Sequence, residues 1–499
     1  MKNIKMLTVS ATIIYILLAL FRTPATVFAE GAQARMNGTV LQVANLAGDA
    51  QDSMNGTVLQ VANLEECIKE ALQNNRRRPA SRFAVEMAEA QHRQALAGYW
   101  PQIGFKGGYL LMDEAPNFLF PASSFSLTTP LGVLPIDVPA QDVKLMDRQS
   151  YIASIDATWL LFDGGMRKGY REQAKGLVDM MKQEARRTDL EIIDSVKRMY
   201  YGAVLSTQLY QVGNDTLARM DATLNLTETM YKEGSGKVKK TDWLDSKVMV
   251  ESLRSMVALL EKNKLMAQAA LANTMGMPWN SSVTPVDKEI PYTPFVDRLD
   301  NIVGTAYSFN PDWARVEAGI RAAEGAVRTA QSGHFPKIAL TGELHKWWND
   351  YDAGLATDRN KEGWTVGVGV EIPLFSGFLT HNKIAEARAR VAKIKEEQLL
   401  FKEGIGLQIK DTFLALNAAE KSHRATLEAM KAAAENRDLN TRAYQNELVE
   451  TEKVIRAQLM EALMSALHYK ARYDHVAFLS QMNLLVGTEV LKRIEGVAK

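Results

Sequence analysis

The sequence repeats itself, and this duplication limits the possible fold more than any other feature of the chain. Four spaced residues recur 235 positions later: Leu64, Ile68, Ala71 and Asn75 return as Leu299, Val303, Ala306 and Asn310. Two short motifs also recur: Gly98-Tyr99-Trp100-Pro101 as Gly333-His334-Phe335-Pro336, and Leu161-Phe162-Asp163-Gly164 as Leu374-Phe375-Ser376-Gly377. We therefore expect two copies of one plan, each with a helix, a strand, a loop, a strand, a long helix, a turn and a helix.

Each copy contains two segments in which apolar and polar residues alternate. These segments lie at about 102–110, 151–162, 337–347 and 364–375. Their lengths are close to the roughly 9–11 residues of a tilted strand that crosses a membrane. Aromatic residues stand near their ends, as at a membrane interface: Trp100, Phe162, Phe335, Trp347, Trp364 and Phe375. A soluble antiparallel sheet shows the same alternation, and the aromatic residues favour the membrane over it.

The helical segments are unusually long. Neither the segment from Met166 to about Lys232 nor that from Thr380 to about Tyr444 contains a proline. At ~1.5 Å per residue each helix is about 100 Å long, so it needs partners along its whole length. Shorter helical segments precede and follow each long one and can flank it. The predicted fold class is mainly α with transmembrane β, with two internal repeats and four strands per chain.

The first residues have the order of an export signal. Lys2 and Lys5 precede an apolar run, and Val27-Phe28-Ala29 provides small residues for cleavage. The run is shorter than the roughly 20 residues of a spanning helix, which disfavours the alternative of an N-terminal anchor. The expected segments are a signal peptide (1–29), an N-terminal segment with the tandem repeat MNGTVLQVANL (30–63), the first repeat (64–275), a proline-rich linker (276–298), the second repeat (299–487) and a C-terminal tail (488–499).

Charge and motif content exclude several classes of protein. The 59 basic residues balance 58 acidic ones, so the chain lacks the basic footprint of a nucleic-acid binder. It contains no HExxH, GxSxG or phosphate-loop motif, and its single cysteine, Cys67, excludes paired-cysteine metal sites. His468 and His475 share a helical face that is compatible with a metal, although a polar coiled-coil surface explains them better. We expect no catalysis, no cofactor and no metal.

Four strands per chain cannot close a membrane barrel. An open sheet edge in hydrocarbon leaves backbone N–H and C=O groups unpaired, at a cost of several kcal/mol each. Copies of the chain must therefore supply the rest of the wall, with eight strands from two copies or twelve from three.

The duplicated plan resembles the TolC-type outer-membrane efflux family. The resemblance rests on Gly-x-x-Pro before the first strand of each copy and on Leu-Phe-x-Gly after the second, across about 64–487. It implies a homotrimer with one twelve-stranded β-barrel in outer-membrane lipid, continuous with a long periplasmic α-helical barrel. It also implies two protein partners, a periplasmic adaptor and an inner-membrane transporter.

The resemblance places the periplasmic entrance at the turn between each long helix and the helix that follows it. The family has Tyr-x-x-Gly before this turn and acidic residues after it. The matching residues of the first turn are Tyr231, Gly234, Asp242 and Asp245. Those of the second turn are Tyr444, Glu450 and Glu452, with Glu447 in place of the glycine. Lys453 and Arg456 stand where the family often has pore-facing acidic residues. A solvated turn of a helical hairpin explains these charges as well as a pore role does.

Two functions remain open. The first is an outer-membrane exit duct of a tripartite efflux or type I secretion system, which conducts substrates passively from the periplasm to the exterior. The second is a periplasmic coiled-coil scaffold whose sheet never enters a membrane. We expect the chain in the outer membrane, with a large periplasmic portion.

Overall fold

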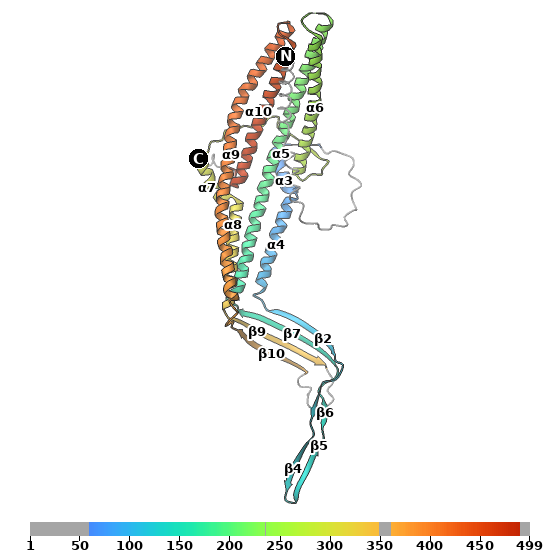
Figure 1. Cartoon of the computed structure of the whole chain (residues 1–499), viewed down its shortest axis with the longest axis vertical. Helices are drawn as coiled ribbons and strands as arrows, with labels where there is room; N and C mark the ends of the chain where they lie inside the picture. Colours follow the sequence, from blue (N-terminus) through green and yellow to red (C-terminus); the bar gives the residue numbers. More distant parts are fainter. Residues whose placement is uncertain (1–58, 235, 349–360, 490–499) are drawn as a thin grey trace. The chain divides into compact units, whose positions relative to one another are not determined.

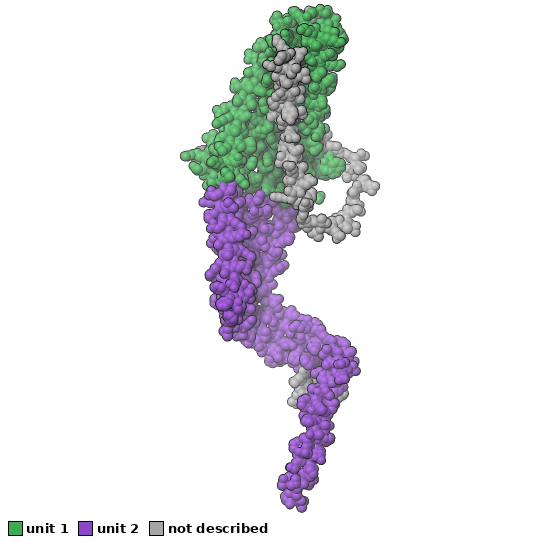
Figure 2. Space-filling model, in the orientation of Figure 1, with its two compact units in different colours: residues 1–78, 189–308, 406–499 green, residues 79–188, 309–405 purple. Residues whose placement is uncertain are grey.

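The computed structural model describes residues 59–234, 236–348 and 361–489. The expected signal peptide, the first copy of MNGTVLQVANL and residues 490–499 of the tail lie outside this range. The chain divides into two compact units (Figure 2). Unit 1 comprises Met1–Arg78, Asp189–Ser308 and Gly406–Lys499, and unit 2 comprises Pro79–Thr188 and Phe309–Ile405. Each unit therefore combines segments from both sequence repeats.

Unit 1 is built mainly from helices (Figure 1). They are α3 (Leu64–Asn74), α6 (Lys240–Thr274), α7 (Leu299–Phe309), α10 (Thr451–Val486) and the parts of α5 (Met166–Lys232) and α9 (Leu379–Gln445) that follow residues 188 and 405. Helices α5 and α9 have the same length, 67 residues, as the proline-free segments predict. Asn63 and Glu66 form a capping box that starts α3, and Gly487 ends α10 with a φ of 81°.

A short parallel sheet that was not predicted brings together the segments before and after the first repeat in unit 1. Strand β1 (Leu59–Ala62) pairs with β8 (Ser282–Pro285), which lies inside the expected linker. Val283 and the nearby Ile290 are fully buried with Cys67 in one apolar cluster. Burial raises the pKa of the Cys67 thiol to about 11, so this cysteine packs as a small hydrophobic residue.

Unit 2 contains a four-stranded antiparallel sheet in the order β10-β9-β7-β2. The strands are β2 (Gln102–Leu111), β7 (Gln149–Phe162), β9 (Lys337–Trp348) and β10 (Glu362–Glu371). Strand β10 ends four residues before the expected Phe375, and Pro373, which has no backbone N–H for a ladder, follows this end. Helices α4 (Arg77–Ala97) and α8 (Pro311–Gln331), a 3-10 turn η1 (Ser332–His334) and the remaining parts of α5 and α9 complete the unit.

The strand register sorts the side chains of this sheet onto one apolar and one polar face. One row across the four strands reads Phe105, Ile155, Leu344 and Trp364, and the adjacent row reads Gly104, Asp156, Glu343 and Thr365. Paired residues in a sheet point to the same side, so the alternation in the sequence becomes a two-sided surface. The apolar residues of the first row are all exposed in a single chain.

The expected loop between β2 and β7 forms a ribbon of four short strands. Strands β3 (Asn117–Phe120) and β6 (Gln141–Lys144) pair, followed by β4 (Ser123–Thr129) with β5 (Gly132–Val138). Pro135 lies within β5, which is compatible with a two-stranded ribbon because the missing N–H can face outward at an edge. The prolines of this segment are therefore compatible with short strands.

Each second strand is linked to its long helix by the Leu-Phe-x-Gly motif. In the first copy, the carboxylate of Asp163 accepts hydrogen bonds from the backbone N–H groups of Gly165, at 3.0 Å, and Arg167, at 2.9 Å. Gly164 has a φ of 65°, a left-handed conformation that favours glycine. The motif therefore turns the chain sharply and caps α5. No helix in the described part of the chain is both long and apolar enough to cross a membrane.

Candidate functional site

The residues predicted for the periplasmic entrance lie at or near two turns of unit 1, between α5 and α6 and between α9 and α10 (Figure 1). The first turn contains Gly234 and Gly236, both left-handed with φ near 75° and 72°. The second turn has Glu447 at the corresponding place, and its φ is 58°. The left-handed turn is thus kept although the glycine is lost, at the expense of backbone strain.

An ion pair joins the two turns. Lys237 Nζ lies 3.0 Å from Glu447 Oε2, and both side chains are substantially exposed. An exposed pair of this kind contributes little to stability. Its significance is positional, because it shows that the turns of the two sequence repeats lie next to each other.

Tyr444 is the buried anchor of the second turn, with 4% of its surface exposed. Its hydroxyl hydrogen-bonds the Thr227 hydroxyl of α5 at 2.6 Å and the Thr451 hydroxyl of α10 at 3.1 Å. One side chain of α9 thus holds two neighbouring helices through their hydroxyl groups. A tyrosine that is buried in this way needs such partners for its polar end.

Tyr231, the equivalent residue at the first turn, has different surroundings. Its ring stacks on Trp243 of α6, with centroids 5.6 Å apart and planes 17° apart. Both residues are partly exposed. The two turns of the duplicated plan are therefore stabilised differently, the first by ring stacking and the second by buried hydroxyl contacts.

The charged residues of the turns fall into two groups. Asp242 has a local structural contact, because its carboxylate accepts a hydrogen bond from the Lys239 backbone N–H at 2.9 Å at the start of α6. Glu452 pairs with Arg456 one helical turn away. Asp245, Glu450, Lys453 and Arg456 are exposed. The structure thus brings Tyr444 together with α5 and α10 and leaves most of the predicted charges facing outward.

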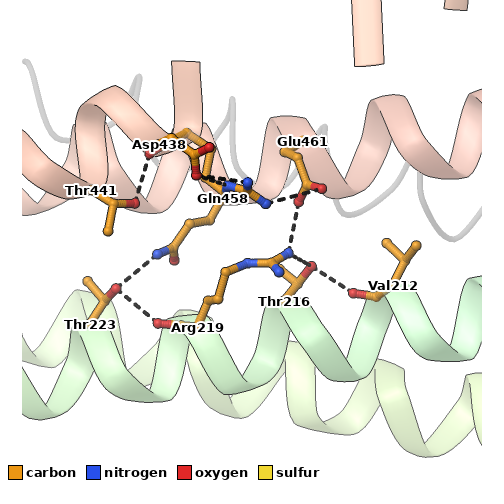
Figure 3. Close-up of polar contacts among 9 residues, drawn as sticks. Val212, Thr216, Arg219, Thr223, Asp438, Thr441, Gln458 and Glu461 are labelled. Carbon is orange, nitrogen blue, oxygen red and sulfur yellow. Dashed lines mark hydrogen bonds and ion pairs between the residues drawn. The ribbon is translucent and has the colours of Figure 1, made fainter. Parts of the chain in front are cut away.

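A polar network between α5, α9 and α10 lies beyond the second turn and was not predicted (Figure 3). Glu461 of α10 accepts from Arg219 of α5 at 2.9 Å and lies 3.4 Å from a guanidinium nitrogen of Arg437 of α9. Only 14% of the Glu461 side chain is exposed. One carboxylate therefore holds cations from two other helices, and the partial burial strengthens these contacts relative to surface pairs.

The network continues toward the second turn. The Gln458 amide donates to the Thr223 hydroxyl at 3.0 Å, and both residues are buried (Figure 3). Thr216, Thr223 and Thr227 follow one side of α5 at helical spacing, and their hydroxyls each donate to a backbone carbonyl one turn earlier. In the sequence, only the helical spacing of these threonines indicates a polar side of α5. It does not reveal which residues of α9 and α10 meet them.

The six predicted interface aromatic residues are all exposed in unit 2. The register places Phe162 and Trp364 on the apolar face of the sheet, whereas Trp347 pairs with Ile152 on the opposite face. Trp348, paired with Tyr151, takes the apolar position at that end of the sheet. Successive side chains of a strand alternate sides, so these two neighbouring tryptophans lie on opposite faces. Trp100, Phe335 and Phe375 lie next to the strands rather than within them.

The chain matches the family model described as outer membrane efflux protein over residues 67–277 and 303–486. The two matched stretches begin and end within a few residues of the two expected repeats and leave out most of the expected linker. This protein belongs to the outer membrane efflux protein family. The expected resemblance is thereby confirmed, and the family is one of efflux proteins rather than enzymes.

Individual relatives of this efflux protein are distant. It is 25% identical over 281 residues to the protein CyaE of Bordetella pertussis, covering 55% of this chain and 58% of the relative. It is 23% identical over 273 residues to the pyoverdine export outer membrane protein OpmQ of Pseudomonas aeruginosa, covering 54% and 55%. The chain thus aligns with little more than half the length of these relatives.

The fold of the efflux protein is shared much more completely. A crystal structure of CusC superposes with a TM-score of 0.68 at 17% identity, and the match covers 90% of this chain and 99% of the other. The similarity confirms the mainly helical fold with an attached sheet. Because the sequence identity is low, this structural similarity supports the fold but does not assign roles to single residues at the turns.

Proposed function

We propose that this protein is the outer-membrane exit duct of a tripartite efflux or type I secretion system. Three copies would close one twelve-stranded β-barrel and one periplasmic α-helical barrel, through which substrates pass without energy input from the duct itself. An adaptor and an inner-membrane transporter would supply the energy and the cargo. Family membership supports this function, as do structural neighbours described as outer-membrane channels, among them OprN and MtrE.

The observation that carries the proposal is the two-sided sheet with two open edges. In the described residues, β2 and β10 form the edges of the four-stranded sheet, and its apolar face is exposed. In lipid, such edges require partner strands, while the apolar face can contact hydrocarbon directly. Further copies of the same chain satisfy both demands.

In this proposal the two turns form the periplasmic entrance. The exposed Asp245, Glu450, Lys453 and Arg456 are its pore-facing candidates, and Glu452 joins them through its pair with Arg456. Tyr231, Gly234, Asp242 and Tyr444 set the conformation of the turns through stacking, left-handed backbone, capping and buried hydroxyl contacts. The relatives include exporters named for pyoverdine and for cations, so the proposal assigns the duct and leaves the choice of cargo to the transporter.

Conductance through a planar lipid bilayer tests the proposal. The mature protein, extracted and purified in detergent, is expected to have the mass of three chains and to produce discrete single-channel currents. A protein that stays soluble and monomeric without detergent and conducts no current would contradict the duct and favour the periplasmic scaffold.

A further inference from the structure

Three of the seven histidines of the chain form one stack in unit 1, together with a tyrosine of the linker. The His423 ring of α9 stacks on the His468 ring of α10, with centroids 5.0 Å apart. The Tyr292 ring also stacks on the His423 ring, with centroids 4.0 Å apart. The centroids of Tyr292 and His475 are 4.8 Å apart, and these two rings are tilted by 51°. We call His423, His468, His475 and Tyr292 the histidine stack.

The histidines of the stack are buried and poorly hydrogen-bonded. The exposed fractions of His423, His468 and His475 are 9%, 4% and 0%. Four of their six ring nitrogens have no hydrogen-bond partner: the Nδ1 atoms of all three rings and Nε2 of His475. Buried polar atoms are normally paired, so this concentration of unpaired nitrogens in one place needs an explanation.

Metal binding does not provide that explanation. Stacked rings lie roughly parallel, 27° apart for His423 and His468, which does not direct their nitrogens toward one central point. Among the described residues, no group of three or more histidine, cysteine, aspartate or glutamate side chains has an arrangement that could hold a metal ion. The unpaired ring nitrogens are instead sites at which the three imidazole rings can bind protons.

The stack attaches the linker to α9 and α10. The Tyr292 hydroxyl donates to Glu420 of α9 at 3.2 Å, and Glu289 of the linker accepts from Arg472 of α10 at 3.3 Å. On its other side the linker is held by α5, where the Tyr200 hydroxyl donates to Asp287 at 3.0 Å. Residues 287–292 thus form a strap between α5 and the α9–α10 pair.

The charges around the stack oppose its protonation. Arg472 of α10 lies close enough to disfavour a positive charge on His423 and His468, and each imidazolium would also repel the next. Glu420 of α9 favours a charge on His475 but already accepts from Tyr292, and Glu289 of the linker is paired with Arg472. Arg424 of α9 adds a further positive charge near Tyr292. The packed stack therefore favours the neutral form of the three imidazole rings.

We propose that the histidine stack is an acid-operated release for the strap. Below about pH 6, protons bind the rings once they separate and hold them apart, so that residues 287–292 leave α9 and α10 while their contacts with α5 remain. The inference concerns the fold of unit 1 and does not depend on the duct function.

The direction of the pH effect follows from the pKa values. Burial, followed by the neighbouring charges, lowers the pKa of His468 from its ordinary 6.5 to about 4, and burial also lowers the pKa values of His423 and His475. A released ring binds its proton at the ordinary value. The packed state is therefore fully favoured above pH 6.5 and loses stability as the pH falls from 6.5 toward 4.

Hydrogen–deuterium exchange of the full-length protein in detergent, at pH 7.5 and pH 5.0 with correction for the intrinsic rates, tests the release. The protection of residues 287–292 is expected to fall about tenfold or more at pH 5.0, the effect of one pKa unit on one group. Residues 250–260 of α6 are expected to keep their protection. Equal protection of the strap at both pH values would overturn the proposal.

Ring-preserving variants separate protonation from packing. The triple variant His423→Phe, His468→Phe, His475→Phe keeps three stacked rings and is expected to lose the pH response, whereas His381→Phe, at an exposed position of α9, is expected to keep it. If the triple variant does not fold, His475→Phe alone is expected to weaken the response. A wild-type response in all phenylalanine variants that fold would also count against the proposal.

Discussion

At the second turn, a glutamate occupies a backbone conformation that favours glycine. Glu447 has a φ of 58°, and its carboxylate pairs with Lys237 of the first turn. The left-handed conformation brings Cβ close to the following carbonyl oxygen, at a cost of roughly 1–2 kcal/mol for a residue other than glycine. The second turn thus keeps its left-handed geometry without the glycine that would adopt it without strain.

The strain at Glu447 leads to a prediction about two substitutions. Both Glu447→Gly and Glu447→Ala remove the pair with Lys237, but only alanine keeps a Cβ in the left-handed region. The glycine variant is therefore expected to be more stable than the alanine variant by about 1 kcal/mol, measured by urea unfolding followed by circular dichroism. At Lys431, exposed inside α9, the order should reverse, because glycine weakens a helix relative to alanine. The same order at both positions would argue against strain at Glu447.

At the scale of elements, the helices α5 and α8 of unit 2 approach each other through glycines. A Cβ added to Gly176 of α5 would lie 2.7 Å from the Ala322 Cβ and 2.9 Å from the Ala322 backbone nitrogen of α8. A Cβ added to Gly169 of α5 would likewise meet the backbone of α8, and one added to Gly325 of α8 would meet the backbone of α5. Small residues at these places let the two backbones come close, so that the long helix gains a partner along this part of its length.

This close approach predicts opposite effects for two identical substitutions. Gly176→Ala is expected to lower the free energy of unfolding by about 1–3 kcal/mol, because the added methyl group meets backbone atoms that cannot move aside. Gly319→Ala in α8 is expected to raise it by about 0.5–1 kcal/mol, because a Cβ there has only an ordinary contact with Met180. Urea unfolding of the two purified variants checks both signs. Stabilisation by Gly176→Ala would show that the helices are not in close contact at this point.

At the scale of the whole molecule, the two faces of the sheet decide how it meets its surroundings. Val368 shares a row with Leu340 and Trp159 on the apolar face, whereas Thr365 pairs with Glu343 on the polar face. In the proposed barrel the first face contacts lipid and the second lines the lumen. A single chain contains both surfaces and leaves both sheet edges open among its described residues.

A charge placed on each face tests this assignment. Val368→Lys is expected to weaken insertion into lipid vesicles by about 2–4 kcal/mol, because the charge would enter hydrocarbon. Thr365→Lys, three residues away on the other face, is expected to insert nearly as well as the unchanged protein. Equilibrium unfolding from vesicles gives both free energies. Equal losses for the two variants would mean that the apolar face is not the lipid face.

Features that depend on local spacing were accessible from the sequence. The proline-free segments predicted the lengths of α5 and α9, and the alternation of apolar and polar residues predicted the four strands with small errors at their ends. The errors have local causes as well. Pro373 lies just beyond the end of β10, where the expected strand continues to Phe375. The family followed from the duplication, because the order of motifs was present twice.

Contacts between residues far apart in the chain were decided only by the tertiary structure. Gln458 and Thr223, which hydrogen-bond each other, are 235 residues apart, and the histidine stack draws on two helices and the linker. Helical periodicity shows which residues share a face, but the register between two helices depends on packing along their whole length. The sequence by itself therefore determined the repeated plan and the two-sided strands, while packing decided which polar groups are buried together.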